Sequence, residues 1–238
     1  MPHSVKESIA FGFCDPGVVD AKFMNGILNV VFWAQQNKIN INNKLRVNGN
    51  QIGRQRQVLF DGWADQNKSD WLLWVDSDIV LTPETFKLVW DAADKNTRPV
   101  VSGLYFVSKE NEKTLMRPIP AIFKEVGNKY EIDFINPIPH NQVIEIDGAG
   151  FGFLLMHKSI IPKIRAVSPD YSLFAEEKNV GDKYISEDVV FFRNLKKAGI
   201  KLHAHTGAIV EHIKRFSFDA NYYNLYWNAL EKGLFTIK

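Results

Sequence analysis

The chain has 238 residues, of which 45% are hydrophobic and 24% charged, a composition typical of globular proteins that argues against a disordered chain. Its 29 Lys and Arg residues against 27 Asp and Glu residues give a formal net charge of +2, which provides no field to attract nucleic acid or an acidic membrane surface. Apolar runs are too short to span a bilayer, the first residues lack a signal-peptide pattern, and the single cysteine cannot form an internal disulfide. We therefore expect one soluble, cytoplasmic domain.

The first hundred residues alternate between strand and helix patterns. The elements expected in chain order are a strand at 8–13, a turn at 14–17, a helix at 19–36, a strand at 44–47, a helix at 52–66, a buried strand at 71–75, a helix capped by Thr82 and running to about 95, and a strand at 99–105. Strands that alternate with helices in this way favour a largely parallel sheet.

The pattern changes in the second half of the chain. The elements expected there are a hairpin at 121–135 around Gly127 and Asn128, a strand at 143–146, an apolar segment at 151–156, a helix at 189–198 that Gly199 stops, a strand at 201–204, and a last helix that Asp219 caps. The hairpin adds antiparallel character to the predicted sheet. The tryptophans at positions 33, 63, 71, 74 and 90 occupy apolar-periodic positions and are expected in the core.

Two acids directly follow the buried strand at 71–75. Asp76 and Asp78 are two residues apart, so their carboxylates are expected to share a face at the C-terminal end of the strand, where open α/β sheets bind ligands. Converging carboxylates favour a divalent cation whose shell is completed by diphosphate oxygens. An acidic turn or a helix cap after the strand is the simpler alternative.

A second acidic pair, Glu187 and Asp188, opens the predicted helix at 189–198. Acids in a first helical turn usually complement the helix dipole. A carboxylate in this place is also suited to accept a proton from an acceptor hydroxyl, and we take Asp188 as the preferred base, with Glu187 close behind.

Three histidines, His203, His205 and His212, lie near the C-terminus. Each is most simply a hydrogen-bonded structural residue. His212 is the best candidate ligand, and an imidazole added to carboxylates would favour manganese over magnesium. Lys214 could neutralise diphosphate charge, or it could belong to a solvated surface pair with Arg215.

The remaining candidates are an acid beside glycines and two arginines. Asp147 precedes Gly148 and Gly150, whose small size would let a ligand approach the backbone, although glycines after a strand often mark only a bend. Arg54 and Arg56 lie in the helix before the acidic strand, where one could reach a phosphate or a sugar hydroxyl while the other is exposed.

Taken in order, residues 71–84, 146–156, 186–191 and 205–212 resemble a small nucleotide-sugar glycosyltransferase of the GT-A fold with an Asp-x-Asp motif. The resemblance covers most of the chain. It implies an α/β fold: a Rossmann-like mixed, mainly parallel sheet flanked by helices, with a smaller antiparallel element on the acceptor side. Residues 1–105 would form the nucleotide-binding half and residues 106–238 the acceptor-side half.

The resemblance also implies roles for individual residues. Asp78 would coordinate Mn²⁺ or Mg²⁺, Asp76 would contact the ribose or the metal, and His212 would be a third metal ligand. Further donor contacts would come from the turn that includes Phe13 and Asp15 for the base, most often uracil, and from Lys214 for a phosphate. Arg54 is the candidate donor arginine, although Arg54 and Arg56 both match the Arg-Asn helix motif of the family only loosely, which leaves open which of the two contacts the donor.

Departures from the family pattern restrict the expected reaction. The chain lacks the Gln-x-x-Arg-Trp signature of processive synthases, so polymer synthesis is not expected. The segment after Asp147 resembles both inverting family-two-like enzymes and retaining mannosyltransferases of the Anp1 type. In an inverting enzyme Asp188 would be the base, whereas in a retaining enzyme Asp147 or a neighbour would stabilise the cationic sugar.

We therefore expect a metal-dependent transferase that moves a sugar from a nucleoside diphosphate, UDP in the first instance, to a glycan or protein hydroxyl. Two alternatives remain open. One is a sugar nucleotidyltransferase, although residues 13–18 lack the Gly-, Arg- and Lys-rich signature expected after its first strand. The other is a catalytically silent module that binds a nucleotide sugar or a glycan.

Overall fold

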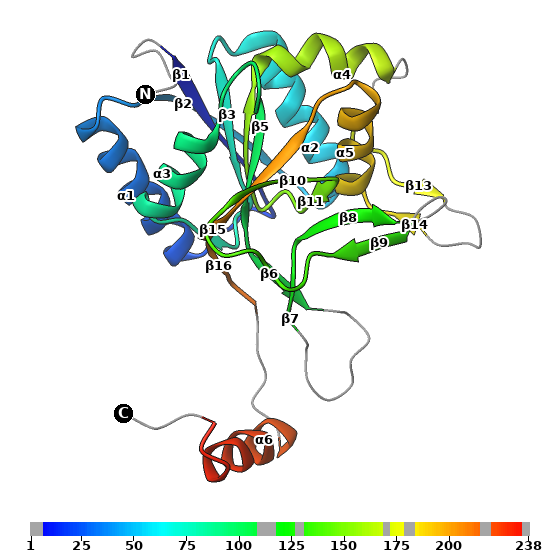
Figure 1. The fold of residues 1–238 in the computed structure, drawn as a ribbon. Coiled ribbons are helices and arrows are strands. Elements are labelled where there is room, and N and C mark those ends of the chain that lie inside the picture. Colours follow the sequence, from blue (N-terminus) through cyan, green and yellow to red (C-terminus); the bar gives the residue numbers. More distant parts are fainter. Residues whose placement is uncertain are drawn as a thin grey trace.

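A seven-stranded sheet, in the order β10-β15-β5-β12-β3-β1-β2, forms the centre of the computed structural model (Figure 1). The structure describes residues 7–108, 118–126, 131–168, 172–178, 184–214 and 220–234. The strands of the central sheet are β1 (Ser8–Asp15), β2 (Asn40–Asn48), β3 (Trp71–Val75), β5 (Val100–Leu104), β10 (Val143–Ile146), β12 (Phe153–His157) and β15 (Leu202–Ile209). Strands β2, β1, β3, β5 and β15 run in one direction, and β12 and β10 run against them.

Helices cover both faces of this sheet. On one face lie α1 (Ala21–Gln36) and α3 (Pro83–Ala92). On the other lie α2 (Ile52–Asp61), which continues as a π-helical turn η1 (Gly62–Gln66), α4 (Ile161–Val167), which follows a short 3-10 turn η2 (Lys158–Ile160), and α5 (Glu187–Lys197). Helix α6 (Ala220–Glu231) stands apart from the sheet in Figure 1.

Four small antiparallel sheets lie beside the central one. Their strands are β8 (Ile122–Val126) with β9 (Glu131–Phe134) and β11 (Gly148–Ala149), β6 (Phe106–Ser108) with β7 (Pro118–Pro120), β4 (Ile79–Val80) with β16 (Glu211–His212), and β13 (Glu177–Lys178) with β14 (Tyr184–Ile185). The pairing of β4 with β16 matters most for function, because it brings a segment from the end of the chain to the loop after β3.

Strand β3 is buried on both faces, which explains its uniformly apolar sequence. Trp71, Leu73 and Val75 face the core beneath α1 and α3. Leu72 and Trp74 face the opposite core, beneath α2, α4 and α5. Trp63 and Trp90 are buried as predicted, while Trp33 is half-buried.

Several element boundaries were predicted correctly from local sequence signals. The predicted strand 71–75 is β3, the Thr82 hydroxyl accepts a hydrogen bond from the Thr85 amide at the start of α3, and Gly199 follows α5 with a φ of 69°. Two strands of the central sheet are longer than predicted: β2 begins at Asn40, and β15 continues to Ile209. Gly127, Asn128 and Asp219 lie outside the described residues.

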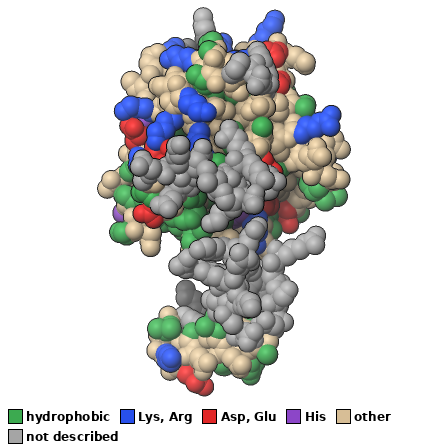
Figure 2. Space-filling view, turned by 90° about the vertical axis from the view of Figure 1, so that its right-hand side faces the viewer, with side chains coloured by type: hydrophobic (Ala, Val, Ile, Leu, Met, Phe, Trp, Pro, Cys, Tyr) green, Lys and Arg blue, Asp and Glu red, His purple; other side chains and the backbone are tan. Residues whose placement is uncertain are grey.

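Basic and acidic side chains are both present on the face shown in Figure 2, in keeping with the small net charge. Among the described residues, no helix combines the length and the apolar character needed to cross a bilayer.

Candidate functional site

A pocket of about 440 Å³ opens at the edge of the sheet where β1 and β3 end. The wall of the pocket comes from the end of β1 with the turn after it, the loop between β2 and α2, the first turns of α2, and the loop after β3. Asp76, Ser77 and Asp78 all contribute to this wall, together with Arg56. The structure therefore places the acidic pair at the sheet edge where open α/β sheets bind ligands.

Asp78 lies against His212. Its Oδ2 atom is 3.1 Å from Nε2 of His212, and its carbonyl oxygen accepts a hydrogen bond of 2.7 Å from the amide of Ile213. Both contacts follow from the antiparallel pairing of β4 with β16, in which His212 is opposite Ile79. Two residues that the sequence analysis assigned to a metal are thus brought together by tertiary structure.

The orientation of the His212 ring is fixed by two contacts. Its Nδ1 atom is 2.8 Å from the carbonyl oxygen of Phe106, and because a carbonyl only accepts, Nδ1 is the atom that carries the hydrogen. The ring of Tyr105 packs edge-on against the imidazole, with centroids 5.0 Å apart. In a neutral imidazole held in this way, the lone pair of Nε2 points at the Asp78 carboxylate.

Such an arrangement suits a shared cation. When the ring is protonated, Nε2 donates a hydrogen bond to Asp78; when the ring is neutral, Nε2 and Oδ2 are both acceptors, and a cation bound to both atoms can take the place of that proton. Adjacent ligands of an octahedral ion with bonds of about 2.1 Å lie about 3 Å apart, which matches the spacing of Oδ2 of Asp78 and Nε2 of His212. A hydrogen bond from the other ring nitrogen to a carbonyl is also the usual support of a metal-bound histidine.

Lys214 adds a positive charge at the same place, since its Nζ atom is 3.0 Å from Oδ2 of Asp78. Burial disfavours the charged form of Asp78, but the hydrogen bonds and charges of protonated His212 and of Lys214 outweigh it, and the pKa of Asp78 lies below its ordinary value of 3.8. The lysine side chain is 53% exposed. Its ammonium group is therefore reached by solvent while it pairs with Asp78.

Asp76 pairs with Arg56 rather than with His212 or Lys214. The Nη2 atom of Arg56 is 3.1 Å from Oδ2 of Asp76, and its Nη1 atom is 2.8 Å from Oε1 of Glu187. The predicted trio of Asp76, Asp78 and His212 is therefore divided into two groups. Among the described residues, no three His, Cys, Asp or Glu side chains converge in a way that could hold a metal ion.

Of the two arginines in α2, Arg56 is the one whose side chain contacts the acidic residues of the site. Arg54 is exposed, and its side chain makes no hydrogen bond or ion pair within the described part of the chain, whereas Arg56 is only 5% exposed. A periodicity signal was available, because Arg56 falls on the same helical stripe as Ile52, Leu59 and Trp63, while Arg54 does not.

The two acids at the start of α5 have different environments. Glu187 is buried against Arg56, and burial raises the pKa of Glu187 above its ordinary value although the arginine acts in the opposite direction. Asp188 is half-buried, and its Oδ1 atom accepts hydrogen bonds from the Ser186 hydroxyl and the Val189 amide. The other carboxylate oxygen of Asp188 has no protein partner in the described residues, which leaves it able to accept a proton.

The turn after β1 lines the pocket, and of the two residues that the resemblance suggested, Asp15 is part of the wall and Phe13 is not. Both carboxylate oxygens of Asp15 are bound by Arg46, at 2.7 and 2.8 Å, and this hydrogen bonding lowers the pKa of Asp15. The amide of Gly17 also donates to Asp15, at 2.7 Å. Phe13 is buried between Phe11 and Phe23 and lines a different pocket, of about 840 Å³, between α1 and β2.

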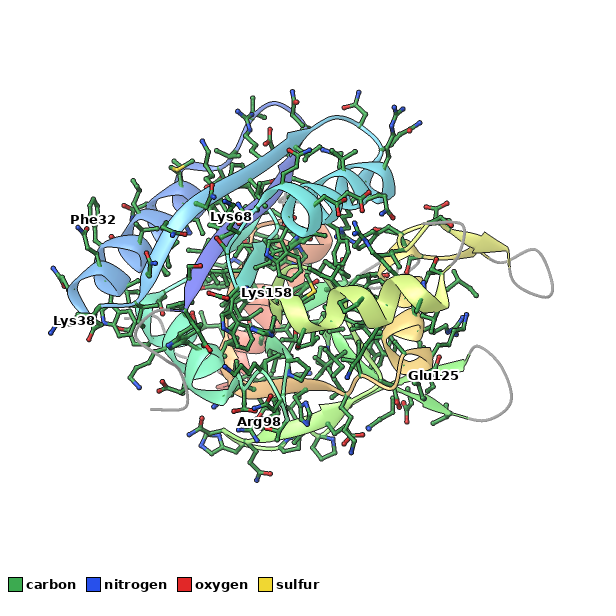
Figure 3. All side chains as sticks on the ribbon, turned by 90° about the horizontal axis from the view of Figure 1, so that it is seen from above. Phe32, Lys38, Lys68, Arg98, Glu125 and Lys158 are labelled. Carbon is green, nitrogen blue, oxygen red and sulfur yellow. The ribbon has the colours of Figure 1, made fainter. Side chains whose placement is uncertain are left out.

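Asp147 lies in another part of the molecule. Its carboxylate is 3.0 Å from Nζ of Lys196, near the C-terminal end of α5, and accepts a hydrogen bond from the amide of Glu125. Figure 3 shows Glu125 beside this helix. The structure therefore places Asp147 on a separate pocket of about 220 Å³, with neither acidic pair in its wall.

Comparison with known proteins finds no protein-family model that matches the chain and no match among curated proteins. Solved structures with a similar fold do exist. The chain aligns with GalNAc-T7, solved with UDP, GalNAc and Mn²⁺, at a TM-score of 0.55 and 9% identity, over 89% of this chain and 44% of that chain.

Two further structures align less well. They are A197 from STIV, with a TM-score of 0.49 and 17% identity over 87% of this chain and 86% of that chain, and a glycosyltransferase involved in the glycosylation of the major capsid of PBCV-1, with a TM-score of 0.47 and 11% identity over 87% and 94%. At these identities the likeness concerns the fold. The predicted fold is confirmed: a GT-A-type α/β sheet, mixed and mainly parallel, covered by helices and accompanied by small antiparallel sheets.

Proposed function

We propose that the protein is a metal-dependent glycosyltransferase that transfers a sugar from a nucleoside diphosphate, UDP in the first instance, to a hydroxyl group of a glycan or a protein. The observation that carries the proposal is the approach of Oδ2 of Asp78 to Nε2 of His212 at 3.1 Å, with Nδ1 of the same ring fixed by the Phe106 carbonyl. This pair lies at the ligand-binding edge of a GT-A-type sheet. The similar GalNAc-T7 structure was solved with UDP, GalNAc and Mn²⁺.

Asp78 and His212 are the residues that would hold the cation. A set of one carboxylate oxygen and one imidazole nitrogen suits Mn²⁺ better than Mg²⁺. With only two protein ligands, most of the coordination positions are left for diphosphate oxygens and water, as is usual for cations that act on nucleotides. When bound, the cation offsets the negative charge that develops on the diphosphate as the glycosidic bond breaks.

Two other side chains would act on the donor and the acceptor. Lys214, already within hydrogen-bond distance of Asp78, would supply positive charge to the departing diphosphate. Asp188, with one carboxylate oxygen unoccupied, would accept the proton of the acceptor hydroxyl. Because Asp147 is bound to Lys196 on a separate pocket, the proposal assigns no step to Asp147 and favours inversion at the anomeric carbon.

Isothermal titration calorimetry with Mn²⁺ and UDP, followed by an assay of UDP release from a panel of UDP-sugars, tests this function. We expect UDP binding that requires the metal, and release of UDP that requires an acceptor. Binding without release for any donor would make the protein a nucleotide-sugar-binding module. Absence of metal-dependent binding for UDP and for the other nucleoside diphosphates would refute the proposal.

A further inference from the structure

A buried arginine joins the two acidic pairs of the site. The guanidinium of Arg56 donates from Nη2 to Asp76 at 3.1 Å and from Nη1 to Glu187 at 2.8 Å. Asp76 is 20 positions and Glu187 131 positions away in sequence, so the contact ties the loop after β3 to the first turn of α5. The Arg56 side chain is 6% exposed, so few water molecules can compete for the hydrogen bonds of its guanidinium.

The plane of the guanidinium is held by aromatic rings. The Arg56 guanidinium carbon lies 4.8 Å from the centroid of Phe151, a distance at which a cation is attracted to the ring face. Phe151 is in turn packed edge-on against Phe174 and Phe191, whose rings stack at 4.8 Å. Arg56 therefore has little freedom to move, and the positions of both bound carboxylates are correspondingly restricted.

A glycine one turn earlier in α2 allows the helix to come close enough for this contact. A Cβ atom on Gly53 would lie 2.6 Å from the carbonyl oxygen of Phe174, which is too close for any real side chain. It would also lie 3.5 Å from Cβ of Glu187. The first turn of α2 thus packs directly on the first turn of α5, with Arg56 on the same side of the helix, three residues further on.

We propose that Arg56 is a positioning residue that sets the first turn of α5, and with it Asp188, relative to the donor site. Its catalytic consequence rests on the proposed function. Glu187 immediately precedes Asp188 in the same helical turn, so a shift of that turn moves both residues. Arg56 need not touch either substrate for this role, because it acts through Glu187 on one side and Asp76 on the other.

Three variants and a control test the proposal. Arg56→Lys keeps the charge but cannot reach both carboxylates in the same plane. Glu187→Met keeps the length of the side chain but removes the oxygen that accepts the Arg56 hydrogen bond, and it preserves the test if the Arg56 variant does not fold. The third variant combines the two changes. Arg193→Gln is the matched control, since it removes another ion pair of α5, with Glu125 at 2.8 Å, away from the pocket.

The kinetic test compares the effect of each variant on donor binding, measured as Kd, with its effect on turnover, measured as kcat. We expect each single variant to lower kcat by about 100-fold, the size of effect that a misplaced catalytic group produces, while the Kd for UDP with Mn²⁺ changes by a much smaller factor. The double variant should be no slower than the slower single variant, because both changes break one connection. Losses of kcat that multiply, or a changed Kd with an unchanged kcat, would overturn the proposal.

Hydrogen exchange of the backbone amides provides a readout that needs no activity. In both single variants, residues 186–192 should exchange faster than in the wild type, while Arg193→Gln should leave these amides protected. Unchanged protection of 186–192 in both single variants would overturn the positioning role. If the wild type shows no transfer, the proposed function fails, and hydrogen exchange still decides whether Arg56 holds the start of α5.

Discussion

Asp78 and His212 are separated by 134 positions in the chain, yet Oδ2 of the first lies 3.1 Å from Nε2 of the second. Their approach depends on the pairing of two very short strands, β4 and β16, each of two residues. Because Nδ1 of His212 is committed to the Phe106 carbonyl, the nitrogen that faces the acid is the one available to a metal.

Asp78→Asn should abolish most metal-dependent nucleotide binding. The amide is nearly the same size as the carboxylate but lacks its charge, so we expect the affinity for UDP with Mn²⁺ to fall by about 100-fold or more in calorimetry. Asp147→Asn is the matched control, since its carboxylate lies on a separate pocket beside Lys196, and it should bind UDP as the wild type does. Equal affinities in the two variants would remove Asp78 from the metal site.

His212→Gln should change which metal is preferred. The glutamine replaces a nitrogen ligand by an oxygen, so the advantage of Mn²⁺ over Mg²⁺ should shrink while the overall affinity falls by about 10- to 100-fold. Calorimetric titration of UDP in the presence of each metal measures both effects. A preference for Mn²⁺ as strong as that of the wild type would show that His212 is not a ligand.

Asp188→Asn should separate donor binding from transfer. The loss of a general base lowers turnover by about 10²- to 10⁴-fold, whereas the donor pocket between β1, β3 and α2 is left intact. We therefore expect the wild-type Kd for UDP with Mn²⁺ together with almost no product. Wild-type turnover in this variant would exclude Asp188 as the base and leave Glu187 as the candidate base.

Stability should fall as the pH drops below about 6.5, because two histidines are buried in a neutral form. Burial lowers the pKa of His157 and of His205 below the ordinary value of 6.5, so the unfolded chain takes up protons that the folded chain does not. The stability they contribute is complete above pH 6.5 and is lost as the pH falls toward the folded-state pKa. Each ring contributes a slope of at most about 1.4 kcal/mol per pH unit.

Urea unfolding at a series of pH values measures this slope. His157→Asn is the informative variant, because Nδ1 of His157 accepts a hydrogen bond from the Ser159 amide and an asparagine oxygen can do the same without titrating. The variant should show a shallower loss of stability below pH 6.5. An identical slope in wild type and variant would contradict the assignment to His157.

The parts of the fold that could be predicted are those with local causes. The uninterrupted apolar run of β3 required burial on both faces, and the hydroxyl of Thr82 marked the start of α3. The position of β12 could not be predicted in the same way. It runs antiparallel between β3 and β5, and nothing in its own residues, Phe153–His157, shows which strands it joins.

The same distinction applies to the candidate site. Asp76 and Asp78 were found because their spacing fixes them at a strand end, whereas their partners are set by tertiary contacts with Arg56 and His212. The sequence analysis also placed Asp15 in the turn that contacts the base, but it did not predict that Arg46 on the neighbouring strand binds both of the Asp15 carboxylate oxygens. That pairing follows from the register of β1 with β2, which places Asp15 opposite Asn48 and Phe13 opposite Arg46.

A crystal of the protein soaked with Mn²⁺ and UDP, measured at the manganese absorption edge, tests the central claim most directly. The account predicts one anomalous peak within bonding distance of both Oδ2 of Asp78 and Nε2 of His212, with the diphosphate of UDP completing the coordination shell. A manganese peak elsewhere, or UDP bound outside the pocket at the ends of β1 and β3, would contradict it.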